Sequence, residues 1–288
     1  MIALPLWQLD RFAAATVIVF ALLSPPSSGA AQAADASQWD GDARATMRLI
    51  AGGPPQPRNA PLRAGVALKL APGWKTYWRY PGDSGVPPRF DFAQSENVKS
   101  VTIGWPAPHR FSDESGSSIG YKGEVIFPLR IVPQDPAKPV LLRLKLDYAV
   151  CEKLCVPAEG HAELALDGAA SHFADALAAA EASVPKPARI GDAAPLAVRA
   201  VHREADGAHP RVVVDVVAPP GPVDLFAEGP SPQWALPLPE PTTAASDGSR
   251  RFVFALDGLP PGASPHGTAL KLTLVAGTKA VEVPAPLD

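Results

Sequence analysis

Cysteine and charge are both scarce in this sequence. Only two of the 288 residues are cysteines, which excludes a disulfide-rich scaffold and a four-cysteine zinc site. Charged residues make up 19% of the chain and the formal net charge is -3, so there is no basic excess of the kind that binds nucleic acid. Because 47% of the residues are hydrophobic, the low charge indicates a folded chain, and the 35 prolines indicate many short strands and rigid turns.

Long apolar runs are also missing, with one exception near the N-terminus. The run FAAATVIVFALL at residues 12–23 is too short for a comfortable membrane span and is followed by small residues. This pattern predicts a secretory signal peptide over residues 1–36, with possible cleavage sites after Ala33 and Ala36. An uncleaved membrane anchor is the alternative. The remainder of the chain is expected to be exported to a compartment that permits disulfides.

Helical periodicity is rare, and alternation of apolar and polar residues dominates instead. The segment LRAGVALKL at residues 62–70 places alternate apolar side chains on one face, and a turn leads into WKTYWRY at residues 74–80. We expect these two segments to form a hairpin. Further strands are expected at residues 98–105, 124–132, 140–150 and 160–166. Regular short strands without helices between them predict an antiparallel sandwich over residues 37–168.

The second half of the chain repeats the strand pattern after a short helical stretch. The alanine-rich segment at residues 171–184 has helical character and ends before two prolines, so we expect a helical linker at residues 169–189. Residues 190–288 are predicted to form a second β-sandwich, which contains no cysteine. The proline-rich stretch at residues 230–241 is expected to be an extended loop or edge. The predicted fold class is therefore all-β, with two antiparallel sandwiches.

The two cysteines lie close together in YAVCEKLCVP, with three residues between Cys151 and Cys155. A helical turn or a hairpin loop would bring such a pair near disulfide geometry. A structural disulfide, a redox-active pair and a metal site all remain open. A disulfide across a loop of about five residues removes little conformational entropy from the unfolded chain. A purely structural disulfide here would therefore stabilise the fold by an amount at the low end of about 0–5 kcal/mol. Lys153, between the cysteines, would favour a thiolate.

Other candidate sites are less specific. Zinc requires four ligands, whereas Cu(I) could be held by the two thiolates and one histidine such as His161, although a histidine in a strand-like run is more typically an ordinary surface residue. The segment GSSIG at residues 116–120 matches the G-x-S-x-G nucleophile motif, but no strand–turn–helix surrounds it, so we interpret it as a flexible loop. The aromatic residues at 74–80 are more typical of packing than of a ligand platform.

Three segments together resemble a known family. They are GWKTYWRYPGDSGVPP at residues 73–88, IGYKGEVIFPL at 119–129 and LDYAVCEKLCVPAEG at 146–160. They are similar to the N-terminal periplasmic domain of the DsbD thiol:disulfide interchange family, and most similar to its branch typified by the suppressor of copper sensitivity protein B. The resemblance covers the first predicted sandwich, and the second half matches only in its two-sandwich layout. It implies immunoglobulin-like domains in the periplasm and thiol–disulfide exchange that needs no metal or organic cofactor.

The resemblance also implies the partners and the exchanging residues. In the family, this domain is reduced by the thioredoxin-like end of a membrane reductase and then reduces periplasmic thioredoxin-fold proteins. Cys151 and Cys155 would be the exchanging pair, with Cys155 as the exposed nucleophile, Cys151 as its resolving partner and Tyr148 lining the site. Because the chain ends at Asp288 without a membrane region or a thioredoxin-like domain, separate proteins are expected to supply and receive the electrons.

A cap loop shields the cysteines in this family, and by position it falls at residues 116–121 of this sequence. The residues expected nearest to the sulfurs are Ser118, Ile119 and Tyr121. The enteric pattern has an aromatic residue at the tip where this chain has Ile119, and the cysteines here are closer together. Two other functions remain open: a periplasmic copper-binding protein that uses both thiols, and a secreted binding module with an inert disulfide.

Overall fold

The computed structural model describes residues 34–54, 60–82, 85–113, 116–204, 210–242 and 249–287. All but the last three residues of the expected signal peptide lie outside these ranges, so that prediction is not tested. Within the described ranges, no helix combines the length and the apolar character that crossing a lipid bilayer requires.

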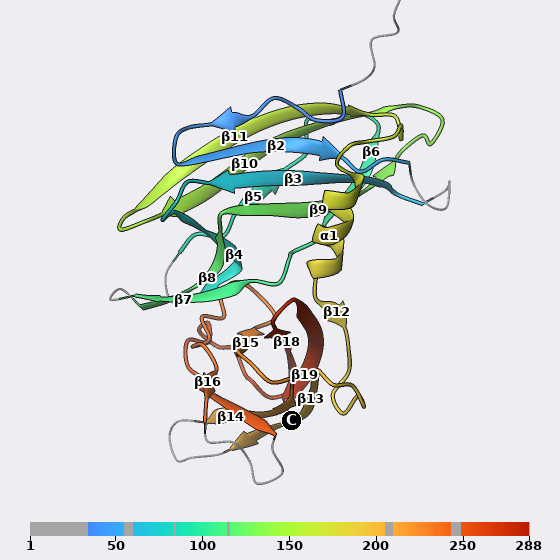
Figure 1. The fold of residues 1–288 in the computed structure, drawn as a ribbon. Coiled ribbons are helices and arrows are strands. Elements are labelled where there is room, and N and C mark those ends of the chain that lie inside the picture. Colours follow the sequence, from blue (N-terminus) through green and yellow to red (C-terminus); the bar gives the residue numbers. More distant parts are fainter. Residues whose placement is uncertain are drawn as a thin grey trace, which may run out of the picture. The chain divides into compact units, whose positions relative to one another are not determined.

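The first sandwich consists of two antiparallel sheets (Figure 1). In spatial order, one sheet contains β1 (Asp40–Gly41), β2 (Ala45–Ala51), β3 (Leu62–Leu70), β9 (Glu124–Pro133) and β6 (Val98–Ile103). The other contains β11 (Cys155–Leu166), β10 (Val140–Cys151), β4 (Lys75–Gly82), β8 (Gly116–Lys122) and β7 (His109–Asp113), and β5 (Arg89–Asp91) pairs with β10.

Strand β10 illustrates why this sequence forms a sandwich. Successive side chains of a strand point to opposite faces, and in β10 the buried leucines alternate with partly or fully exposed residues such as Arg143 and Lys145. The inward residues, among them Leu142 and Leu144, join the core of the first sandwich. Full burial of such a side chain contributes about 1.5–3 kcal/mol relative to leaving it exposed, so the alternation determines which face turns inward.

The predicted hairpin between residues 62–70 and 74–80 is wrong. Strand β3 pairs with β2 and β9, whereas β4 pairs with β8 and β10 in the opposite sheet. The expected turn is present, because the Trp74 amide donates to the Ala71 carbonyl at 3.0 Å, but it carries the chain from one sheet to the other. Both strands have an apolar face, so local pattern alone could not distinguish a hairpin from a crossover between sheets.

Helix α1 (Ala174–Ser183) packs on the outer surface of the first sandwich. Its fully buried Leu177 lies against Gly52 and Gly65. A Cβ atom would lie 2.4 Å from the leucine side chain if added at Gly52 and 3.0 Å from it if added at Gly65. The Arg63 guanidinium of β3 donates to both carboxylate oxygens of Glu181, at 2.9 and 2.7 Å. The segment expected to be a linker is therefore also docked on the first sandwich.

The second sandwich likewise consists of two sheets, and each of them has four strands. One contains β12 (Lys186–Pro187), β19 (Lys279–Leu287), β18 (Thr268–Ala276) and β15 (Val223–Glu228); the other contains β13 (Ala197–Glu204), β14 (Arg211–Val217), β17 (Arg250–Ala255) and β16 (Glu240–Pro241). All pairings are antiparallel except that of β12 with β19. The predicted fold class, two immunoglobulin-like antiparallel β-sandwiches with a short helix between them, is confirmed.

The two sandwiches have a common apolar core region in addition to their separate cores. Most of the buried residues of the second sandwich form a cluster of their own. Four of its residues instead belong to the core cluster of the first sandwich, namely Phe226, Leu238, Val275 and Ala280. Leu238 comes from the proline-rich segment that was expected to be an extended loop, and Trp234 and Leu236 of the same segment are buried as well. The second sandwich therefore packs directly on the first.

Candidate functional site

The two cysteines close the long hairpin formed by β10 and β11. Cys151 is the last residue of β10, Cys155 is the first residue of β11, and the two lie opposite each other in the strand register. They form a disulfide, with 4.2 Å between their Cα atoms. Of the two local geometries that the spacing allowed, the structure has the hairpin loop, and its three residues Glu152, Lys153 and Leu154 are all exposed.

The two sulfur-bearing residues differ in their access to solvent. Cys151 is only 4% exposed and packs with Tyr77 and Ala149, whereas Cys155 is exposed. A thiolate that approaches from solvent therefore reaches Cys155 first. Attack at that sulfur would leave Cys151 as the departing group, because thiol–disulfide exchange breaks the bond to the sulfur that is not attacked.

Tyr77 of β4 is the residue that contacts both sulfurs. Its hydroxyl oxygen lies 3.0 Å from Cys151 Sγ and 2.9 Å from Cys155 Sγ, and its side chain is 1% exposed. Neither sulfur of a disulfide carries a proton, so the tyrosine hydroxyl is the donor. Sequence reasoning assigned the aromatic residues at 74–80 to packing as a group, and nothing in the local sequence distinguished this tyrosine from the others.

Two glycines allow the chain to approach this tyrosine closely. A Cβ atom on Gly85 would lie 2.4 Å from the Tyr77 ring, and the residue has a φ of +141°, a conformation that only glycine adopts readily. Gly120 of β8 is the register partner of Tyr77, and a Cβ atom there would lie 1.9 Å from the Thr76 carbonyl oxygen. The Gly85 backbone thus packs against the ring, whereas Gly120 lets β8 lie close to the backbone of β4.

Two lysines follow Cys151 across the strand register of the sheet. Lys75 of β4 is the register partner of Cys151, and Lys122 of β8 is in turn the register partner of Lys75. Lys75 is buried, whereas Lys122 and Lys153 are exposed. Cationic surroundings favour the thiolate over the thiol, so this side of the sheet suits a cysteine that must carry negative charge during exchange.

Three of the residues expected near the sulfurs lie in the main core instead. Ile119, Tyr121 and Tyr148 all belong to the core cluster of the first sandwich, whereas the cluster around Cys151 contains Tyr77. The Tyr121 hydroxyl donates to the Pro106 carbonyl at 2.9 Å, and burial raises its pKa well above the usual value. Burial likewise raises the pKa of Tyr148 to about 12, with a smaller contribution from nearby aspartates.

Ser118 is placed differently from Ile119 because side chains alternate along a strand. It is buried and shares a strand face with Gly120, the residue opposite Tyr77. The interpretation of residues 116–120 as a flexible loop is wrong, since they belong to β8, which forms a hairpin with β7. The tip of that hairpin, residues 114–115, lies outside the described residues. The segment expected to be the cap loop is therefore a β-strand, in which Ser118 pairs with Phe111 of β7.

The structure does not bring the candidate histidine to the thiols. His161 lies six residues beyond Cys155 in β11, which corresponds to about 20 Å along an extended strand. Its Nε2 atom is 3.6 Å from a carboxylate oxygen of Glu159. In the part of the chain that the structure describes, no three histidine, cysteine, aspartate or glutamate side chains gather in a way that could hold a metal ion.

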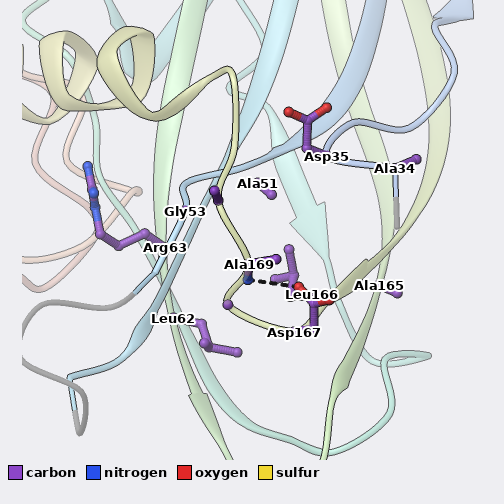
Figure 2. Close-up of a pocket in the computed structure, with 12 residues that line it drawn as sticks. Ala34, Asp35, Ala51, Gly53, Leu62, Arg63, Ala165, Leu166, Asp167 and Ala169 are labelled. Atoms are coloured by element: carbon purple, nitrogen blue, oxygen red, sulfur yellow. Dashed lines mark hydrogen bonds between the residues drawn. The ribbon is translucent and has the colours of Figure 1, made fainter. Parts of the chain in front are cut away.

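A pocket at the far end of β11 is too small for a ligand. It lies where Leu166, Asp167 and Ala169 leave the strand and approach Asp35 (Figure 2). Its volume is about 20 Å³, which is enough for one water molecule. The Asp167 carboxylate accepts the Ala169 amide at 2.9 Å and stabilises the turn there.

A larger groove of about 540 Å³ begins two residues after Cys155. Its lining contains Val86, Pro87, Pro157 and Ala158 together with Tyr148 and the charged residues Arg89, Asp147 and Glu159. Val86 is 58% exposed, and Leu154 in the hairpin loop is 78% exposed, the highest value for a large hydrophobic side chain among the described residues. Exposed apolar side chains of this kind mark interaction surfaces, and here they lie near the accessible sulfur.

Comparison with known proteins agrees with this geometry. The family model described as "Thiol:disulfide interchange protein DsbD, N-terminal" matches residues 53–167. The crystal structure of the N-terminal periplasmic domain of ScsB from Proteus mirabilis has a similar fold, with a TM-score of 0.65 and 20% sequence identity over 88% of this chain and 98% of that chain. The comparison with curated proteins found no match.

The family model covers most of the first sandwich, so the resemblance predicted from the three sequence segments is confirmed for that part of the chain. The structural match extends the likeness in fold to both sandwiches, since it covers 88% of this chain. A domain of this family with its two cysteines paired at a hairpin end supports thiol–disulfide exchange.

Proposed function

We propose that this protein is a periplasmic thiol–disulfide exchange protein that relays reducing equivalents through Cys151 and Cys155. It would receive them from a separate membrane thiol reductase and pass them to thioredoxin-fold partners. The observation that carries this proposal is the asymmetric disulfide, with Cys155 exposed, Cys151 buried and the Tyr77 hydroxyl within 3.0 Å of both sulfurs. A structural staple needs no such arrangement.

The reductive half of the cycle follows from the access to each sulfur. A thiolate of the donor attacks Cys155 Sγ, the Cys151–Cys155 bond breaks, and its electron pair remains on Cys151 Sγ. The Tyr77 hydroxyl donates a hydrogen bond to that new thiolate, and the positive charge of Lys75 opposes its negative charge. A second donor thiolate then attacks the donor sulfur of the mixed disulfide, which releases Cys155 as a thiolate and leaves the donor oxidised.

The second half reverses these steps with a different partner. The Cys155 thiolate attacks the disulfide of an oxidised thioredoxin-fold protein and expels one of its sulfurs as a thiolate. The Cys151 thiolate then attacks Cys155 Sγ, which releases the partner as a dithiol and restores the Cys151–Cys155 disulfide. Two electrons pass in each half, and the thiolates take up or release protons from water, so no cofactor enters the cycle.

The exposed apolar residues around the disulfide provide a contact for these partners. Leu154 is next to the attacked cysteine, and Val86 and Pro87 line the groove that begins beyond it. A thioredoxin-fold protein that places its cysteine on Cys155 would cover these side chains. Ser118, Ile119 and Tyr121 would support the hairpin that shields the disulfide, and Tyr148 would support β10 from the core side.

A redox titration of the mature protein tests the proposal. Free thiols would be trapped by alkylation and counted by mass in dithiothreitol and glutathione buffers of defined potential. Reversible interconversion of one cysteine pair between about -120 and -300 mV, the range of known exchange proteins, is the expected result. A disulfide that stays closed well below that range would refute the proposal. Stoichiometric Cu(I) uptake by the reduced protein, lost in Cys151→Ser, would instead favour copper binding.

A further inference from the structure

The three residues that follow Tyr77 in β4 all contact the second sandwich. The Trp78 ring lies 5.7 Å from the ring of Phe226 in β15, measured between centroids. The Tyr80 hydroxyl donates to the Leu236 carbonyl at 2.6 Å. Arg79, between them, forms ion pairs with two glutamates of the second sandwich. The strand that carries the tyrosine of the redox site is thus also the strand on which the second sandwich docks.

Arg79 makes the most directional of these contacts. Its Nε and Nη2 atoms donate to the two carboxylate oxygens of Glu228 at 2.9 and 2.6 Å, and Nη2 also donates to Glu282. The guanidinium carbon lies 4.4 Å from the centroid of the Trp78 ring. Arg79 and Glu228 are both mostly buried, so this is a bidentate charge-assisted pair with little competition from water.

The backbone after Tyr77 is not paired with β8 over the next four residues. Tyr77 pairs with Gly120 of β8, but the next paired residue of β4 is Gly82, which is opposite Ser118. Residues 78–81 therefore form a bulge that leaves the ladder between these two strands. Tyr77 is the last paired residue before the bulge, and side chains that contact the second sandwich hold the residues immediately after it.

We propose that the second sandwich is a structural part of the redox site, and that Arg79 is a positioning residue. By binding Glu228 and Glu282 it holds the bulge of β4, and through the bulge it keeps the Tyr77 hydroxyl between the two sulfurs. The second sandwich thereby sets how readily Cys151 leaves as a thiolate. This inference rests on the proposed exchange function and assigns a role to a domain that has no cysteine of its own.

The test uses the full mature chain and three arginine variants. The rate constant for reduction of the disulfide by dithiothreitol at pH 7 would be measured by alkylation and mass. Because the Tyr77 hydroxyl would be displaced and not removed, Arg79→Met should be reduced about threefold to tenfold more slowly, which is part of the effect of losing a hydrogen bond to a charged group altogether. Arg79→Lys should recover part of the rate. Arg63→Met removes a bidentate pair with Glu181 that lies away from the disulfide, so its rate should equal that of the unmodified chain.

A double variant separates positioning from a general loss of stability. If Arg79 acts through Tyr77, then Arg79→Met should add little to the slowing already caused by Tyr77→Phe. Where Arg79→Met does not fold, as judged by circular dichroism, Glu282→Gln removes one of the two partners and should give a smaller slowing in the same direction.

Two results would overturn the inference while leaving the proposed function intact. One is a reduction rate in Arg79→Met, or in Glu282→Gln if that variant is used, equal to that of the unmodified chain. The other is slowing that is fully additive with Tyr77→Phe. A disulfide that cannot be reduced reversibly in the unmodified chain would contradict the proposed function itself.

Discussion

Each of the two sandwiches contains a long antiparallel hairpin, and the two hairpins close differently. In the second sandwich, β18 and β19 are joined by Gly277 and Thr278, and the closing pair is Ala276 opposite Lys279. In the first, β10 and β11 are joined by a three-residue loop, and the closing pair is the disulfide. A hairpin of similar length forms without a covalent link in the second sandwich, so the disulfide of the first is not required for the hairpin geometry.

The comparison also shows how little distinguishes a redox domain from a structural one on the same fold. Both domains are two-sheet sandwiches with alternating apolar residues in their cores. In the proposed mechanism, the chemistry of the first depends on the cysteine pair, on Tyr77 beside it and on the interrupted pairing of β4. Function therefore resides in a small site on a fold that by itself specifies none.

The largest effect is expected from removing the exposed cysteine. Cys155→Ser should abolish exchange with any thiol partner, because the attacked sulfur is gone, while the free energy of unfolding should fall only slightly for so short a disulfide loop. Exchange would be measured with a thioredoxin-fold substrate, and stability by urea unfolding. Cys151→Ser is the matched control, since it should retain an attackable Cys155 and accumulate a mixed disulfide. A stability loss of several kcal/mol in Cys155→Ser would restore the staple interpretation.

Removing an aromatic ring from the region where the two cores meet should separate their roles. Phe226→Ala should lower the free energy of unfolding by about 3–5 kcal/mol, as expected for a large buried side chain. It should also slow reduction of the disulfide, because Phe226 packs against Trp78 next to Tyr77.

Phe254→Ala is the matched control in the second core, where the ring is buried but belongs to the separate cluster. It should cost a similar free energy of unfolding and leave the reduction rate unchanged in the folded protein. Equal reduction rates in both variants would mean that the first sandwich works independently of the second.

A substitution on the surface should affect partners without affecting small thiols. Leu154→Ser should slow exchange with a thioredoxin-fold protein by up to about tenfold, because the exposed side chain would be buried in the complex. Its reduction by dithiothreitol should not change. Ile190→Ser, at an exposed apolar residue between β12 and β13 of the second sandwich, should leave both rates unchanged. A loss of the dithiothreitol rate in Leu154→Ser would show that the leucine shapes the loop instead of contacting a partner.

The smallest effect concerns alkaline pH and again distinguishes the two sandwiches, because all four tyrosines lie in the first. Burial raises the pKa of Tyr148 to about 12, so this side chain stays neutral in the folded protein while an unfolded tyrosine ionises near pH 10. Its contribution to stability is complete below pH 10 and should be lost as the pH rises toward 12. Urea unfolding at pH 8 and pH 11 would measure this, and Tyr148→Phe should lose less stability across the interval.

Particular residues show which features could be predicted from the sequence. The period-two pattern placed β10 and much of β11 correctly, since a half-buried strand has a local signature. The Cys-x3-Cys spacing and the three family segments singled out the two cysteines that the structure pairs in a disulfide. The pattern did not show that β3 and β4 lie in different sheets, because either arrangement buries the same apolar faces. It also could not select Tyr77 over Tyr121 and Tyr148, because their roles depend on which face of a strand meets which neighbour.

The sequence by itself determined the strand-rich class, the pair of cysteines and the family of the first sandwich, because these depend on local periodicity and on short conspicuous segments. Only the tertiary structure decided which cysteine is exposed, which tyrosine reaches both sulfurs and how the second sandwich is joined to β4. Those features arise from contacts between residues up to about two hundred positions apart, such as Arg79 with Glu282. Such contacts form only when burial of all the apolar faces at once selects one arrangement of the strands.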